Sequence, residues 1–151
     1  TIWFRNVWSW GGETVRPSLS QADAHSVAAV HPVLGPRRFH ADGTPEWLFT
    51  ENDTNLERFG HGPNLTPYVK DGINDYLVHG RATAVNPRRT GTKACAHYPI
   101  TVEPGASQVL RLRLSGDAGA AAATATPSGD FFGAAFDAVM NDRRREADDD
   151  R

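Results

Sequence analysis

The chain has 151 residues, a length that suits one domain with a substantial core. Its 16 Lys and Arg and 18 Asp and Glu give a formal net charge of −2, which provides no basic surface for nucleic acid. No apolar run approaches the ~18 residues of a membrane span, and the single Cys95 excludes an internal disulfide. We expect neither a nucleic acid nor a membrane as a partner.

The opening segment at 1–10, TIWFRNVWSW, is rich in β-branched and aromatic side chains, and the turn signal Gly11-Gly12 follows it, which predicts a strand. Its tryptophans allow two interpretations: they belong to the core, or Trp8 and Trp10 form part of a platform for a sugar ring. The segment has no basic leader and no signal-peptide organisation, which predicts a cytoplasmic protein. It opens within a strand, from which we expect a piece of a longer protein.

Residues 13–23 are polar, and we expect a loop there. Strand-like segments follow, separated by the turn signals Gly35-Pro36 and Asp42-Gly43, and the second of these favours a hairpin. The simplest topology for these segments is a meander. The predicted strands are 26–34, 37–40 and 46–49.

The stretch from Glu46 to Arg81 concentrates the residue types that can do chemistry. Between the strand-like pieces 47–49 and 76–78, it contains a connection far longer than the ~12–15 residues that are usual in a compact domain. A disordered linker would lack aromatic residues such as Phe59 and Tyr68. The stretch is therefore predicted to be an ordered loop with a functional role.

Asp71 and Asp75 stand four residues apart, the spacing that stacks two carboxylates on one helix face and can raise one pKa for acid–base chemistry. Gly72 and Asn74 oppose a helix at this place, so a turn closed by Asp71 or Asp75 is the preferred interpretation. Glu51 and Asp53 allow the same two interpretations. Spacing alone thus identifies no catalytic residue.

The histidines are scattered, with no pair at metal-ligand spacing and no Cys partner, so we expect no metal site and no cofactor. Their positions are His25, His31, His40, His61, His79 and His97.

Residues 92–102 alternate in polarity, and 108–114 repeat the pattern with Leu110, Leu112 and Leu114 on one face. The two segments predict a β-hairpin with one face on the core and one in water. Pro99 predicts an edge position for the first of them.

The predicted fold is mainly β: an antiparallel β-sandwich at 1–116, expected to be incomplete, then an Ala/Gly-rich linker at 117–129. A C-terminal amphipathic helix is expected at 130–151, capped by Asp130 or Ser128. The apolar residues of its face recur at the helical spacing; they are Phe132, Ala135, Phe136, Val139 and Met140.

Four segments form an ordered set of motifs: WFRNVWSWG at 3–11, LFTENDTN at 48–55, PYVKDGINDY at 67–76 and VNPRRTGTKA at 85–94. As a set they resemble the amino-terminal β-domain of large bacterial glucosidases related to glycoside hydrolase family 63, the group of mannosyl-oligosaccharide glucosidase and mannosylglycerate hydrolase. The resemblance extends from Thr1 to about Asp148. It implies a β-sandwich docked on an (α/α)6 barrel.

The resemblance also implies inverting hydrolysis of a glycosidic bond by a carboxylic acid and a carboxylate that lie on the barrel, downstream of this region. It therefore implies no catalytic residue in this chain. The partners it implies are the catalytic (α/α)6 domain of the same protein and an oligosaccharide or glycoside substrate.

Two functions follow as hypotheses. In the first, the chain is the non-catalytic β-domain of a glycoside hydrolase and is inactive alone. In the second, it is an autonomous carbohydrate-binding or protein-interaction module in which Trp8, Trp10 and Tyr68 are stacking groups.

For the first hypothesis, Pro67–Arg81 is predicted to meet the catalytic domain, because loops on a rigid sheet often carry binding surfaces. The polar contacts are assigned to Lys70, Asp71, Asn74 and Asp75. The alternative is that Asp71 and Asp75 only close local turns.

Overall fold

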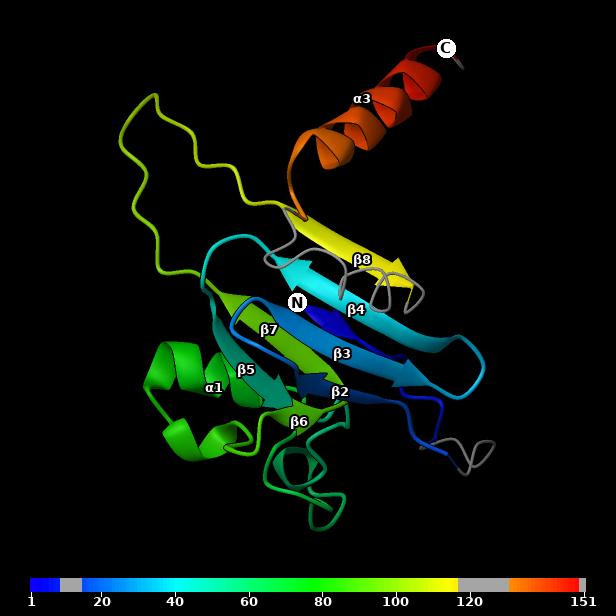
Figure 1. Cartoon of the computed structure of the whole chain (residues 1–151). Helices are drawn as coiled ribbons and strands as arrows, with labels where there is room; N and C mark the ends of the chain where they lie inside the picture. Colours follow the sequence, from blue (N-terminus) through cyan, green and yellow to red (C-terminus); the bar gives the residue numbers. More distant parts are fainter. Residues whose placement is uncertain (9–14, 117–130, 150–151) are drawn as a thin grey trace.

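The computed structural model describes residues 1–8, 15–116 and 131–149. In these ranges the chain forms two antiparallel sheets and a C-terminal helix, which confirms the predicted mainly β, sandwich-like fold (Figure 1). Trp10, the turn signal Gly11-Gly12 and the predicted linker at 117–129 lie outside the described residues.

The smaller sheet has the strand order β1-β7-β5, with bounds Ile2–Trp3, Lys93–His97 and Glu46–Thr50. Strand β5 is buried on both faces. Trp47 and Phe49 point into the core between the sheets, whereas Leu48 and Thr50 alternate to the other side, where helix α1 (Gly72–His79) packs. This double burial explains the continuous apolar run of β5.

The larger sheet has the order β6-β2-β3-β4-β8, and β2, β3 and β4 form a meander. Its strands are β2 (Ser18–Gln21), β3 (Ser26–His31), β4 (Gly35–Ala41), β6 (Thr90–Gly91) and β8 (Leu112–Gly116).

The core lies between the sheets. Its buried cluster joins β2, β3 and β4 of the larger sheet with β5 and β7 of the smaller one, and the Phe39 and Trp47 rings meet edge to face at 6.1 Å. Full burial of a Val, Leu or Phe side chain contributes roughly 1.5–3 kcal/mol to the free energy of unfolding. The cluster consists of Leu19, Val27, Ala29, Phe39, Ala41, Trp47, Phe49 and Ala94.

The predicted loop at 13–23 is wrong over Ser18–Gln21, which form β2 between β3 and β6. Leu19 is the one apolar residue of this strand, and it is completely buried. Tertiary burial of Leu19 and pairing on both edges outweigh the polar composition.

Both predicted hairpins are wrong. Asp42-Gly43 does turn the chain, with Gly43 at a φ of 66°, but the strands it joins, β4 and β5, belong to different sheets. Likewise β7 pairs with β1 and β5, whereas β8 pairs with β4. Pro99 has no N–H for a ladder, and beyond β7 the chain leaves the small sheet for an extended connection to β8 (Figure 1).

The expected loop and strand-like piece at 71–78 are also wrong, because helix α1 occupies Gly72–His79. Gly80, at a left-handed φ of 65°, ends the helix. Gly72 opposes a helix in isolation, but a Cβ there would lie 2.2 Å from the Ala84 carbonyl oxygen. Close packing against β5 and the short helix η3 (Ala82–Ala84) thus selects glycine, and burial of Ile73 holds the helix in place.

The predicted C-terminal helix is present as α3 (Ala134–Asp149), although none of its described residues is buried. Its predicted caps, Ser128 and Asp130, lie outside the described residues. Throughout the described part of the chain, no helix has the length and apolarity to cross a bilayer, and no three metal-binding side chains gather.

Candidate functional site

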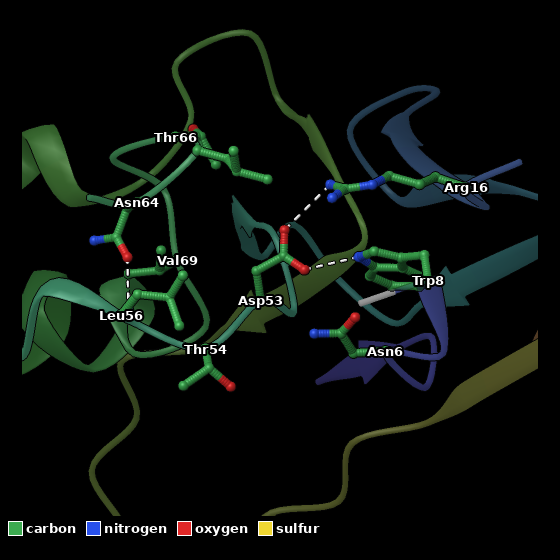
Figure 2. Close-up of a pocket in the computed structure, with 10 residues that line it drawn as sticks. Asn6, Trp8, Arg16, Asp53, Thr54, Leu56, Asn64, Thr66 and Val69 are labelled. Atoms are coloured by element: carbon green, nitrogen blue, oxygen red, sulfur yellow. Dashed lines mark hydrogen bonds and ion pairs between the residues drawn. The ribbon is translucent and has the colours of Figure 1, made fainter. Parts of the chain in front are cut away.

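A pocket of about 540 Å³ opens where the long connection after β5 meets the segment after β1 (Figure 2). Its walls combine an aromatic ring, charged and amide side chains and aliphatic residues. The lining consists of Asn6, Trp8, Arg16, Asp53, Thr54, Leu56, Asn64, Leu65, Thr66 and Val69.

Asp53 is the centre of this pocket. Its carboxylate accepts a hydrogen bond of 2.7 Å from Trp8 Nε1 and one of 3.1 Å from Arg16 Nη1 (Figure 2). The Arg16 guanidinium also lies 5.4 Å from the centre of the Trp8 ring, in a cation–π contact. The Asp53 backbone carbonyl accepts the Lys70 N–H. One residue therefore ties the amino-terminal segment to the long connection.

Trp8 is 8% exposed, its N–H is bound by Asp53, and its ring is in contact with Arg16. The ring is thus engaged by groups of the domain itself. Tyr68 is half-buried and lies outside the pocket lining, and Trp10 lies outside the described residues.

Asp71 is the centre of a second polar cluster, which shares Asn64 with the pocket lining. Its Oδ2 accepts hydrogen bonds of 3.2 Å from Asn55 Nδ2 and from Arg58 Nη1. Asn64 donates to the Asn55 side chain and accepts the Leu56 N–H. Burial alone would raise the pKa of Asp71, but the hydrogen bonds from Asn55, from its own backbone N–H and from Arg58 lower it. Asp71 is therefore held as a carboxylate.

The other predicted interface residues differ in their surroundings. Lys70 Nζ donates to Thr54 Oγ1, and Asp75 forms an ion pair of 3.1 Å with Arg81. Asn74 is exposed on α1. Of the four residues assigned to an external contact, three are thus engaged inside the domain.

Glu46, at the start of β5, joins α1 to β7. It accepts a hydrogen bond from the Tyr76 hydroxyl and one of 2.9 Å at His97 Nδ1. The Tyr76 bond is the main reason that the pKa of Glu46 is lowered, and the same bond raises the pKa of Tyr76.

All six carboxylates between Glu46 and Arg81 accept hydrogen bonds from this domain. Glu51 accepts from Thr92 Oγ1 at 2.7 Å and Glu57 from the Asn64 N–H at 3.0 Å, in addition to the four described above. A general acid needs a raised pKa at neutral pH, and Glu46 and Asp71 have lowered ones. The six carboxylates are Glu46, Glu51, Asp53, Glu57, Asp71 and Asp75.

Arg16, Arg58 and Asn64 belong to these clusters, but the sequence alone did not identify them as candidate site residues. Arg16 lies 37 residues from Asp53, and Arg58 lies 13 residues from Asp71. Contacts between residues this far apart along the chain leave no periodic pattern in the sequence. The density of Asn and Asp at 52–55 was the only local indication.

The chain is similar to the uncharacterized protein YMR196W of Saccharomyces cerevisiae, at 29% identity over 183 residues. The match includes 97% of this chain and 16% of the yeast protein, so the chain spans about a sixth of that relative's length. No protein-family model matches the chain. No solved structure matches it significantly.

Proposed function

We propose that this chain is the non-catalytic β-domain of a glycoside hydrolase of the glucosidase type, in which a separate domain carries out inverting hydrolysis. The observation that carries the proposal is that all six carboxylates of the chemistry-rich stretch at 46–81 are bound by the domain itself. Carboxylates held in this way stabilise the domain and are poorly placed to exchange protons with a substrate.

Inverting hydrolysis requires an acid with a raised pKa and a base roughly 6.5–9.5 Å away, with a water between them. The pKa values of Glu46 and Asp71 are shifted in the opposite direction, by hydrogen bonds that favour the ionised form. This shift supports the assignment of acid and base to another domain.

The motifs behind the family resemblance meet in space around Thr50. This residue is fully buried, and it belongs to the motif at 48–55. A Cβ on Gly91, in the motif at 85–94, would lie 2.3 Å from the Thr50 carbonyl oxygen. A Cβ on Gly72, in the motif at 67–76, would lie 3.3 Å from Thr50 Cγ2. Three of the four motifs therefore supply one packing centre, which supports a structural role for them.

The match to the yeast protein supports a multidomain parent, because nearly the whole of this chain corresponds to a small part of a much longer polypeptide. In the proposed enzyme, the catalytic (α/α)6 domain and a glycoside or oligosaccharide substrate are the partners.

The proposal requires a longer polypeptide that contains this chain together with a catalytic domain, which we call the longer protein. The test is an assay of the longer protein and of the 151-residue chain on an aryl glucoside and on glucose-containing oligosaccharides. We expect turnover by the longer protein and none by the chain. Turnover by the chain would contradict the non-catalytic assignment. A longer protein without glycosidase activity would contradict the enzyme class.

The alternative function is an autonomous carbohydrate-binding module, and the pocket around Asp53 is the observation in its favour, because it joins an aromatic ring to amide and charged groups. The engagement of Trp8 by Asp53 and Arg16 weighs against stacking on a sugar. A sugar titration that perturbs tryptophan fluorescence of the chain without turnover would favour this alternative.

A further inference from the structure

The start of the C-terminal helix is fastened to the larger sheet. Arg111 Nη1 donates to the Phe132 carbonyl at 2.7 Å, and Arg113 Nη1 donates to the Phe131 carbonyl at 3.3 Å. The Phe131 ring stacks on His40 of β4, with centres 3.8 Å apart and planes inclined by 22°. These contacts hold the segment before α3 against the larger sheet, and in Figure 1 this segment lies beside the start of β8.

Beyond these contacts at its start, α3 packs little against the rest of the domain. None of its described residues is buried, and Val139 and Met140 are 58% and 42% exposed. Helices shorter than ~12–15 residues are marginal in water, and those slightly longer still depend on packing of an apolar face. A helix of 16 residues with an exposed apolar face is therefore expected to have a partner surface.

The neighbouring strand is equally uncovered. β8 is the edge strand of the larger sheet and pairs only with β4 among the described strands. Leu112 and Leu114 are 47% and 59% exposed, although sequence periodicity predicts them on a core-facing side. Exposed, contiguous apolar side chains at this density are typical of interaction sites.

Between α3 and residues 109–112, which lead into β8, lies a groove of about 580 Å³, which we call the C-terminal groove. Leucines of the strand segment form one wall, and Phe136 and Met140 form the other; Asp137 and Arg144 add charges of both signs. A groove between a helix and a strand is suited to an amphipathic helix, whose apolar stripe can contact both walls. The lining consists of Val109, Leu110, Arg111, Leu112, Phe136, Asp137, Met140, Asn141 and Arg144.

The yeast relative indicates where an occupant of this groove can come from. The match covers 97% of this chain but only 16% of the relative, so there the corresponding region is joined to several times its own length of polypeptide. We propose that the C-terminal groove docks an amphipathic helix from another domain of the same longer polypeptide. This inference rests on the proposed function only in that both require a second domain.

The test compares three lysine substitutions in the chain and in the longer protein. Leu112→Lys and Met140→Lys introduce a charge on either wall of the groove, and Val33→Lys is a matched control at an 82% exposed position in the turn between β3 and β4. We expect at most a small change in the melting temperature of the chain for all three, because Leu112 and Met140 are already about half exposed, at 47% and 42%, and Val33 is more exposed still. In the longer protein, Leu112→Lys and Met140→Lys should each lower it by about 3 °C or more, and Val33→Lys should not.

Equal melting temperatures for all three variants of the longer protein would overturn the proposal. So would a dimer of the isolated chain, seen by sedimentation, that Met140→Lys dissociates, because a second copy would then be the occupant. The melting comparison needs no glucosidase activity, so an inactive longer protein would refute the proposed function and leave this inference standing or falling on its own result.

Discussion

Two regions of the molecule contrast in how they use their side chains. Pro67–Arg81 is rich in charged and amide groups, and most of these groups bind other parts of the same domain. The segment from β8 to α3 carries exposed aliphatic side chains beside a groove. An abundance of polar residues thus marks an internal framework here, whereas the surface available to a partner is apolar.

The largest expected effect tests the close packing of the first region. Gly72→Ala should destabilise the chain by about 3 kcal/mol, because the new Cβ would meet the backbone oxygen of Ala84 at 2.2 Å. This cost exceeds the roughly 0.5–1 kcal/mol that alanine gains over glycine in a helix. Urea denaturation measures the difference.

The matched control for that substitution is Gly116→Ala in β8, where, apart from the chain neighbours, the described residues place no heavy atom within 4 Å of the added Cβ. It should leave stability unchanged or slightly higher. Equal losses for the two alanine variants would remove the packing contrast between the regions.

Asp53→Ala should cost about 1–3 kcal/mol, because it leaves the Trp8 N–H without an acceptor. Asp53→Asn should cost less, since an amide oxygen can still accept that bond, and the Arg16 ion pair is partly exposed and contributes roughly 0–1 kcal/mol. Chemical denaturation of both variants provides the check. If the two substitutions are equally mild, Asp53 is not the tie between the segments.

Asp71→Ala and Asn74→Ala separate internal support from external contact. Asp71→Ala should destabilise the isolated chain by about 1–2 kcal/mol through the lost bonds from Asn55 and Arg58, and Asn74→Ala by less than about 0.5 kcal/mol. The hypothesis that Asp71 contacts the catalytic domain predicts the opposite result. It requires Asp71→Ala to spare the chain and to lower kcat/KM or loosen docking only in the longer protein.

Acid titration should affect the two regions in different pH ranges. Burial, together with the nearby Arg38 and Arg113, lowers the pKa of His40, on which Phe131 stacks, and Asp23 opposes the shift. The unfolded chain therefore binds this proton first, so stability should fall as the pH drops below the ordinary histidine value of 6.5, by at most about 1.4 kcal/mol per pH unit. Thermal melts at a series of pH values between about 5 and 8 should show this slope, because a histidine charge changes in that range.

The control for the histidine prediction is His40→Gln, which should flatten the slope, whereas the exposed His79→Gln should keep it. The lowered pKa values of Glu46 and Asp71 affect the stability of the chain at lower pH. Their stabilising contribution is complete above the ordinary carboxyl values of 4.5 and 3.8 and is lost as the pH falls below them. A slope above pH 5 that survives in His40→Gln would contradict this division.

The sequence predicts the elements whose pattern is local. The strands around Val27, Phe39 and Phe49 and the C-terminal amphipathic helix follow from composition and periodicity. It misses β2, where Leu19 is a single apolar residue in a polar segment, and α1, where tertiary packing accommodates Gly72. The sequence also predicts a wrong pairing of β7 with β8, because these strands follow each other along the chain but belong to different sheets.

For the candidate site, the sequence identifies the correct stretch and several of its acids, including Asp53 and Asp71. It does not identify their partners, because Arg16 and Arg58 reach these acids only after the chain has folded. Nor does it reveal that the leucines of β8 are about half exposed, since periodicity predicts a shared face but not which element covers that face.

The claim that the β8–α3 surface meets the rest of the longer protein can be tested most directly at Met140. It is the only methionine of the chain, it is 42% exposed, and it lines the C-terminal groove. Its oxidation to the sulfoxide by hydrogen peroxide, followed by mass spectrometry of the peptide that contains it, reports solvent access. We predict oxidation at least about tenfold slower in the longer protein than in the isolated chain; equal rates in the two would contradict the claim.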